Sequence, residues 1–131
     1  FLPGYIRASG AGLAFVEDGG ASLTLPAAHA AKLAGHLDKA VVLGIRPQQL
    51  SLASGPTEGR SLAIKVQITE PLGDLIDASG STNVGHRLVA RLSADRGELP
   101  NIAPGQAVHL LVDIESSHIF ETGEFGRNLT L

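Results

Sequence analysis

The stretch Val108-His109-Leu110-Leu111-Val112-Asp113-Ile114-Glu115 decides the fold class. Its first, third, fifth and seventh residues are apolar and would share one face of an extended chain, whereas His109, Asp113 and Glu115 would share the other. Such alternation is typical of a strand that buries one face in a hydrophobic core. The sequence therefore predicts a β-strand over residues 108–115.

Other apolar runs repeat this pattern along the chain. Residues 62–69 alternate in the same way, with Leu62, Ile64, Val66 and Ile68 predicted to point inward. The runs on either side of Asp18-Gly19-Gly20 predict a β-hairpin, because this tripeptide favours a tight turn. The shorter predicted strands are Gly4–Ala8, Leu13–Val16, Ala21–Leu25, Val41–Ile45, Leu75–Ala78, Leu88–Leu92 and Ser117–Phe120.

One stretch, residues 26–37, predicts a helix. Pro26 suits a first helical turn, the Ala-rich run that follows favours a helix, and Gly35 limits its length. Many short strands with one short helix indicate an all-β domain, built as a small barrel or a sandwich.

The composition limits the size and class of the protein. The chain has 131 residues and a net charge of −3, with no Cys and no Met. This length suits one domain, or two very small intertwined ones, and the Ser-, Gly- and Pro-rich stretch 51–59 is the candidate boundary. Because translated chains begin with Met and this sequence begins with Phe1, we expect it to be a piece of a longer protein.

Sequence motifs for catalysis, metal binding and membrane crossing are not found. No Lys follows the spacing of a phosphate-binding loop, and there is no nucleophile elbow or zinc-binding helix motif. His29 and His36 could share a helical face, but the favoured interpretation is two exposed side chains rather than metal ligands. Asp74 and Asp77 are three residues apart in an alternating strand, so they are not expected to converge as an acid–base pair. No run reaches the roughly 20 apolar residues of a membrane span.

The segment Gly44-Ile45-Arg46-Pro47 is expected to close a strand with a rigid turn. A residue that precedes proline is restricted to extended backbone, and a glycine allows another segment to approach closely. The Arg46 guanidinium would therefore project from a fixed strand end, which suits a bidentate ion pair. An ion pair that fixes the corner is the favoured interpretation, and ligand binding is the alternative.

The same segment resembles the G-I-R-P-E-H/D motif in ATP-binding subunits of bacterial ABC importers of the maltose and glycerol-phosphate type. Phe1-Leu2-Pro3-Gly4 looks like the junction after that family's ATPase domain, and Glu70-Pro71-Leu72-Gly73-Asp74 is similar to its E-x-L-G-x-E segment. Residues 101–112 and 117–123 resemble the next strand and the terminal H-L-F-D-x-x-T-G. The chain departs from these motifs at Gln48, Glu121 and Asp74.

The resemblance implies a C-terminal regulatory region with an OB-fold-like (MOP/TOBE-type) architecture: small β-barrels, two of them intertwined, with one short helix. Such a region is non-catalytic; ATP and Mg would bind only in an upstream ATPase domain. The expected partners are that domain, a second copy of the chain, membrane permease subunits and a regulatory protein, at the cytoplasmic face of the inner membrane. The structural or interface residues implied are Gly44, Arg46, Pro47, Glu70, Gly73, Asp74, His118 and Phe120.

Two other binding functions remain as alternatives. Residues 79–83 are expected to form a polar hairpin loop, where Ser79, Ser81 and Thr82 could bind an oxyanion as the barrels of related molybdate importers do. A nucleic-acid-binding barrel is the less favoured alternative, because single-strand binders combine a basic groove with stacking aromatic residues. This chain is net acidic and has only one Tyr and four Phe. We therefore expect no nucleic-acid partner.

Overall fold

The computed structural model describes residues 1–94, 99–123 and 126–131. Within these residues, ten strands form two antiparallel sheets of five strands each. The strands are β1 (Leu2–Ser9), β2 (Gly12–Glu17), β3 (Ser22–Thr24), β4 (Ala40–Gly44), β5 (Leu50–Ala53), β6 (Ser61–Leu72), β7 (Leu75–Thr82), β8 (Arg87–Ser93), β9 (Ala107–Val112) and β10 (His118–Glu121). The helical elements are α1 (Ala27–Leu33) and the 3₁₀ turns η1 (Ala34–His36), η2 (Pro47–Gln49) and η3 (Ile114–Ser116).

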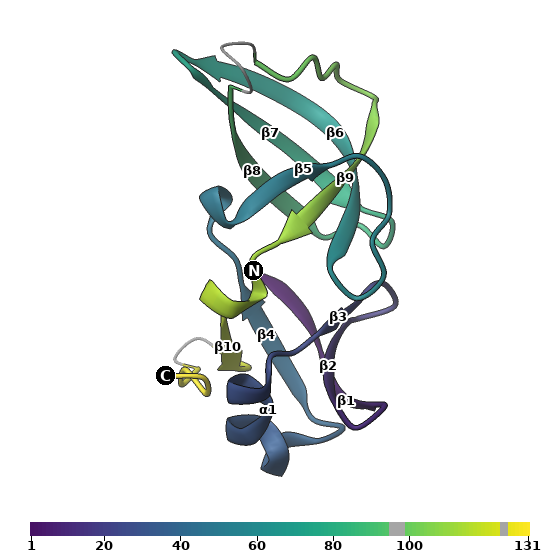
Figure 1. The fold of residues 1–131 in the computed structure, drawn as a ribbon, viewed down its shortest axis with the longest axis vertical. Coiled ribbons are helices and arrows are strands. Elements are labelled where there is room, and N and C mark those ends of the chain that lie inside the picture. The colour runs from purple at the N-terminus through teal and green to yellow at the C-terminus, as the bar shows by residue number, and fades with distance from the viewer. Residues whose placement is uncertain (95–98, 124–125) are drawn as a thin grey trace.

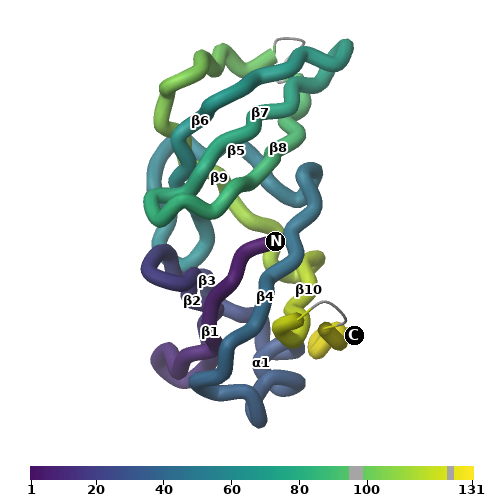
Figure 2. The backbone as a smooth tube through the Cα atoms, turned by 180° about the vertical axis from the view of Figure 1, so that it is seen from behind, coloured from purple at the N-terminus to yellow at the C-terminus, as the bar shows by residue number. Residues whose placement is uncertain are grey.

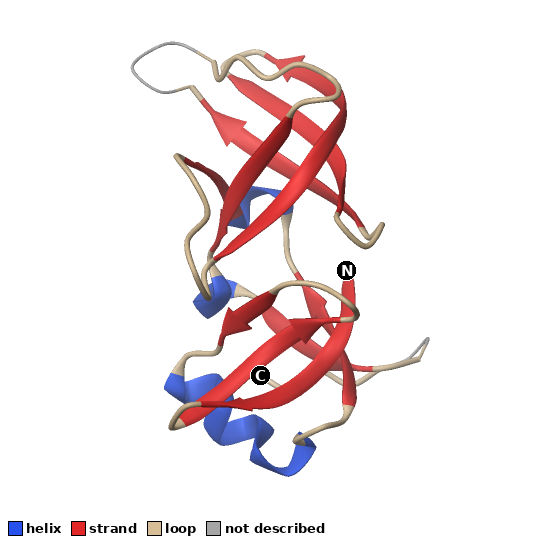
Figure 3. Ribbon diagram, turned by 90° about the vertical axis from the view of Figure 1, so that its right-hand side faces the viewer, coloured by secondary structure: helices blue, strands red, loops and turns tan. Residues whose placement is uncertain are grey.

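The two sheets form two lobes that are stacked along the longest axis of the molecule (Figure 1). The first lobe has the strand order β10-β4-β1-β2-β3, and the second has β5-β9-β6-β7-β8. In the second lobe the edge strands β5 and β8 lie in contact, so this sheet closes into a small barrel. Helix α1 lies at the end of the first lobe that is farther from the second (Figure 3).

The two lobes are intertwined, because the chain passes from the first lobe to the second and then back to the first. It leaves the first lobe after β4, builds the whole second lobe, and returns to add β10 beside β4 (Figure 2). In that pair His118 lies opposite Gly44, and Phe120 lies opposite Val42. The predicted fold class, all-β OB-type barrels with one short helix, is confirmed.

The strand predicted over residues 108–115 ends earlier than expected. β9 stops at Val112, and the chain turns into η3. The Asp113 carbonyl accepts hydrogen bonds from Ser116 N at 3.3 Å and from Ser117 Oγ at 2.9 Å. These local bonds replace the ladder, so Ile114 does not continue the inward face of the strand.

Ile68 was predicted to point inward, and this prediction is wrong. A bulge between Val66 and Ile68 adds one residue to β6. Because side chains alternate along a strand, the extra residue reverses the faces beyond it. Ile68 is 59% exposed as a result, whereas Val66 is fully buried.

Two further expectations about local structure are corrected. Residues 79–82 belong to strand β7, paired on both sides, and do not form a loop. Strand β5 was not predicted; it occupies the beginning of the stretch 51–59, so the chain has already changed sheets across residues 45–49. The division of the chain at 51–59 stays a prediction. The helix begins as expected after Pro26, and its last turn is the 3₁₀ turn that contains Gly35.

A continuous hydrophobic core passes through both lobes. Its fully buried members include Leu2 and Leu43 in the first lobe, and Leu62 and Leu110 in the second. Among the described helices, none has the length and apolar character that a membrane crossing requires.

Candidate functional site

The motif residues Gly44, Arg46 and Pro47 form the corner at which the chain leaves the first lobe. Arg46 has the extended backbone expected before a proline, with φ −79° and ψ 148°. Gly44 is required by close packing: a Cβ built there would lie 2.9 Å from the Phe120 ring and 3.2 Å from the Phe1 ring. A larger residue would push these two rings away from the strand.

Gln49 holds this corner together through its side chain. Its Oε1 accepts a hydrogen bond from Arg46 N at 2.9 Å, and its Nε2 donates to Ser116 O at 2.7 Å. Gln49 therefore joins η2 to η3, two turns that are far apart in the sequence. Gln49 was not among the predicted site residues, because its N3 position is only half of a capping box and Arg46 stands where Ser or Thr is usual.

A pocket of about 230 Å³ opens at this corner. We call it the corner pocket; its lining residues are Phe1, Gly44, Ile45, Arg46, Gln49, Ser116, His118 and Phe120. The family resemblance implied Gly44, Arg46, His118 and Phe120 as structural or interface residues, and the pairing of β4 with β10 brings them together. The resemblance motifs from the middle and the end of the chain thus meet at one place.

The corner pocket combines aromatic and basic groups. The rings of Phe1 and Phe120 meet edge to face, with centroids 6.1 Å apart. His118 Nδ1 hydrogen-bonds Thr130 Oγ1 at 3.2 Å, which fixes the imidazole ring. No acidic residue lines the pocket, and within residues 1–94, 99–123 and 126–131 the Arg46 guanidinium forms no ion pair. The expected corner-fixing ion pair is therefore not seen there.

The remaining motif candidates lie elsewhere. Gly73 and Asp74 form the turn of the β6–β7 hairpin, and Glu70 lies near the end of β6 opposite Asp77. This hairpin tip is at the end of the second lobe remote from the first (Figures 1 and 2). Gly73 has a φ of 69°, which only glycine adopts without strain. The Asp74 carbonyl accepts a hydrogen bond from Ala94 N at 3.0 Å. These residues shape a turn and are separate from the corner pocket.

The oxyanion candidates lie in strand β7, and not in an open loop. Ser79 and Ser81 are partly exposed on one face, whereas Thr82 is buried on the other. Ser81 lies between Lys65 on β6 and Arg87 on β8, both exposed. The backbone amides are in the sheet ladder, so an anion would have to be bound by side chains on this face.

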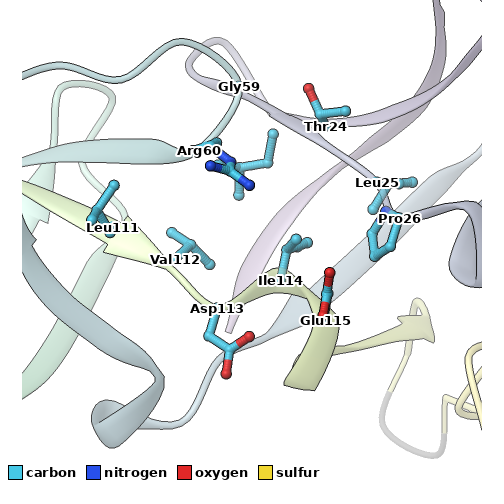
Figure 4. A pocket seen from close by; sticks show the side chains of 11 residues that line it. Thr24, Leu25, Pro26, Gly59, Arg60, Leu111, Val112, Asp113, Ile114 and Glu115 are labelled. Atoms are coloured by element: carbon cyan, nitrogen blue, oxygen red, sulfur yellow. The ribbon is translucent and has the colours of Figure 1, made fainter.

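A second pocket, of about 340 Å³, lies between the lobes (Figure 4). Residues 23–26 contribute from the first lobe, and Gly59, Arg60 and residues 111–115 complete the walls. Arg60, Asp113 and Glu115 supply charges of both signs, and no sequence motif pointed to them. The adjacent Gly59 carbonyl accepts a hydrogen bond from Thr24 N at 2.8 Å, which joins the two lobes at this side of the pocket.

A buried polar cluster also joins the lobes, and no sequence motif indicated it. Glu17 on β2 is 2% exposed. Its Oε2 accepts hydrogen bonds from Thr82 Oγ1 and from His86 Nδ1, both at 2.6 Å. Because Thr82 and His86 belong to the second lobe, this carboxylate ties one sheet to the other.

Two of the residues considered for metal or acid–base chemistry, His29 and Asp77, have structural contacts. His29 Nε2 donates to Ser117 O at 2.9 Å, and no group of three potential metal ligands occurs in the described part of the chain. Asp77 accepts two hydrogen bonds from Arg91, at 2.9 and 3.0 Å. Asp74 lies in the preceding turn and is not part of this pair.

Comparison with known families identifies the fold family. Residues 43–120, more than half of the chain, match the TOBE domain family. The chain belongs to the TOBE domain family. Residues 1–50 match the MalK OB fold domain, and the two matches overlap at the corner that contains Arg46. TOBE and OB-fold domains are non-catalytic binding modules.

A solved structure has the same architecture as this TOBE chain. It is the cytoplasmic molybdate-binding protein ModG with molybdate bound, and the superposition has a TM-score of 0.70. The match covers 92% of this chain and 94% of that chain at 16% sequence identity, so it shows a shared fold. A comparison with curated proteins gives no significant match.

Proposed function

We propose that this TOBE chain is the regulatory and dimerisation region of the ATP-binding subunit of a bacterial ABC importer for sugars or related solutes. The observation that carries the proposal is the order of the two family matches, the MalK OB fold domain followed by the TOBE domain. The resemblance of Gly44-Ile45-Arg46-Pro47 to the motif of such subunits supports the same assignment.

In this role the chain itself does no chemistry. ATP and Mg would bind to an upstream ATPase domain, and the partners would be that domain, a second copy of the chain, the membrane permease subunits and a regulatory protein. The subunit would work at the cytoplasmic face of the inner membrane.

The test is deletion of residues 1–131 from the intact subunit. We expect nucleotide binding to be retained, and subunit pairing or the regulation of ATP hydrolysis to be weakened. Loss of nucleotide binding itself would contradict the proposal. A phosphate-binding loop and an ABC signature should also be encoded upstream of Phe1, and their absence would contradict it independently.

A second candidate function is the binding of a tetrahedral oxyanion. Two observations favour it: the shared fold with a molybdate-binding protein, and the position of Ser81 between the exposed cations Lys65 and Arg87. Molybdate or sulfate at millimolar concentration should then raise the melting temperature, since a ligand that binds only the folded state stabilises it. Ser81→Ala should reduce this shift, whereas Ser54→Ala, in an exposed connection, should not. No shift with either anion would remove this candidate.

A further inference from the structure

We propose that the corner pocket binds a carboxylate that is attached to an apolar or aromatic group. The ligand would be a small organic acid or the C-terminal residue of a peptide, which share this chemistry. The proposal does not depend on the transporter role.

The apolar part of the ligand is indicated by the two phenylalanines. Phe120 and Phe1 form one wall, edge to face at 6.1 Å, and Phe1 is 79% exposed. Exposed aromatic rings attract a further ring, in an edge-to-face or an offset-stacked arrangement, and also bury apolar groups. Gly44 lets both rings lie close to the strand, because a Cβ built there would lie 2.9 Å from the Phe120 ring and 3.2 Å from the Phe1 ring.

The charged part of the ligand is indicated by Arg46. Arg46 is an exposed residue that lines a pocket with no acidic residue among its described lining, although the whole chain carries a net charge of −3. Within the described residues, Arg7, Arg91 and Arg127 each pair with a carboxylate, whereas Arg46, Arg60 and Arg87 form no ion pair. An arginine fork is well matched to the two oxygens of a carboxylate.

The backbone around Arg46 is held in place before any ligand binds. Pro47 restricts the backbone of Arg46, and Gln49 ties it to η3 through hydrogen bonds of 2.9 and 2.7 Å. His118 on the opposite strand is fixed by Thr130. Binding therefore needs little ordering of the protein, which favours affinity for a small ligand.

The size of the pocket limits the ligand to a fragment or one side chain. Its volume of about 230 Å³ lies below the roughly 300–1,000 Å³ that is typical of pockets for drug-sized molecules. A single phenyl or aliphatic group with its carboxylate is a suitable occupant. A nucleotide or a disaccharide is not.

The experiment is an NMR titration of the ¹⁵N-labelled chain, with the α-amino group of Phe1 capped so that no ammonium competes. The probes are phenylacetate and the peptide Gly-Gly-Phe with a free C terminus. The matched neutral probes are phenylacetamide and the same peptide with an amidated C terminus. We expect saturable shifts at the amides of Gly44, Arg46 and Phe120 with the acids, and at least about tenfold weaker binding of the amides.

Variants then test the assignment of each part. Arg46→Gln should weaken binding of the acids about tenfold. Phe120→Leu should weaken the binding of phenylacetate more than the binding of acetate, which has no ring. Arg60→Gln is the matched control, because it removes an exposed arginine from the other pocket. If Arg46→Gln does not fold, Arg46→Lys serves instead, since lysine keeps the charge and loses the fork.

The outcomes distinguish a small organic acid from a peptide C terminus, and both from a failure of the proposal. Binding of phenylacetate alone assigns the pocket to small organic acids, and binding of the peptide alone assigns it to peptide C termini. Equal affinity for acids and amides would overturn the proposal. So would shifts that map away from the corner, or an equal loss in Arg46→Gln and Arg60→Gln.

Discussion

His86 donates a 2.6 Å hydrogen bond from Nδ1 to the carboxylate of Glu17, and this bond connects the two lobes. Thr82 Oγ1 donates to the same carboxylate oxygen, also at 2.6 Å. Glu17 is 2% exposed, and a carboxylate at such depth is tolerated only when it has partners. The cluster therefore links the two sheets through hydrogen bonds, which restrict their relative orientation. Apolar contacts are not directional and restrict it less.

Replacing Glu17 with Gln should lower the free energy of unfolding by about 1–3 kcal/mol, because the buried Thr82 hydroxyl and the half-buried His86 imidazole then lose their charged acceptor. Urea denaturation followed by circular dichroism measures this. Glu58→Gln is the control, since Glu58 is an exposed carboxylate in the 54–60 connection. Equal midpoints for the two variants would show that the cluster does not hold the lobes together.

Sequence alone could predict most strands because alternation is a local pattern. Residues 62–66 and 108–112 show their inward faces directly, and the structure buries those faces. Strand β5 was not predicted, because it has only four residues and lies next to a Ser-, Gly- and Pro-rich stretch. The bulge in β6 was not predicted, because no residue type requires a bulge at Gln67. This bulge turned Ile68 to the opposite face of the strand.

The candidate site was predictable where its residues are neighbours in sequence. Gly44, Arg46 and Pro47 form one short motif, and His118 and Phe120 another. Their meeting depends on the return of β10 to the first sheet, which local patterns do not encode. The Glu17–His86 bond spans 69 positions and depends on how two lobes are stacked, so no local signal could have revealed it.

Gly80→Ala should destabilise the second lobe. A Cβ at Gly80 would overlap the carbonyl oxygen of Lys65 and lie 3.1 Å from the Cα of Val66, both of which are backbone atoms of β6. Because a strand backbone cannot move without breaking its ladder, we expect a loss of about 1–3 kcal/mol or more in unfolding free energy. The measurement is chemical denaturation.

Gly35→Ala is the matched control for that substitution. Gly35 lies in the 3₁₀ turn η1, and no heavy atom of the described residues outside its immediate neighbours lies within 4 Å of a Cβ built there. We expect unchanged or slightly higher stability, up to about 1 kcal/mol, because alanine restricts the unfolded chain. A similar loss in both variants would mean that close packing at Gly80 does not matter.

The Asp77–Arg91 pair should contribute to the pH dependence of stability. Hydrogen bonds from Arg91, and secondarily its charge, hold the pKa of Asp77 below its usual value of 3.8. A carboxylate whose pKa is lowered by folding stabilises the protein above its unfolded pKa, and this contribution is lost as the pH falls through the folded pKa. Arg91→Gln should therefore lower the melting temperature above about pH 4 and have progressively less effect below it.

The control for this pH experiment is Arg87→Gln, because Arg87 is an exposed arginine on the same strand. This substitution removes the same charge, but the difference in melting temperature between Arg87→Gln and the wild type should not shrink as the pH falls. Melting curves between about pH 2 and 6 test both variants. A constant difference between the wild type and Arg91→Gln across that range would contradict the assignment.

Gln49→Ala should weaken the corner more than Gln48→Ala does. Gln49 joins Arg46 N to Ser116 O through its amide group, whereas Gln48 is exposed beside it. Loss of two hydrogen bonds at a partly exposed position should cost about 1–2 kcal/mol in unfolding free energy. Amide hydrogen exchange should rise at Arg46 in the Gln49 variant alone. If Gln48→Ala has the larger effect, the position of the usual motif glutamate, and not its neighbour, fixes this corner in the TOBE chain.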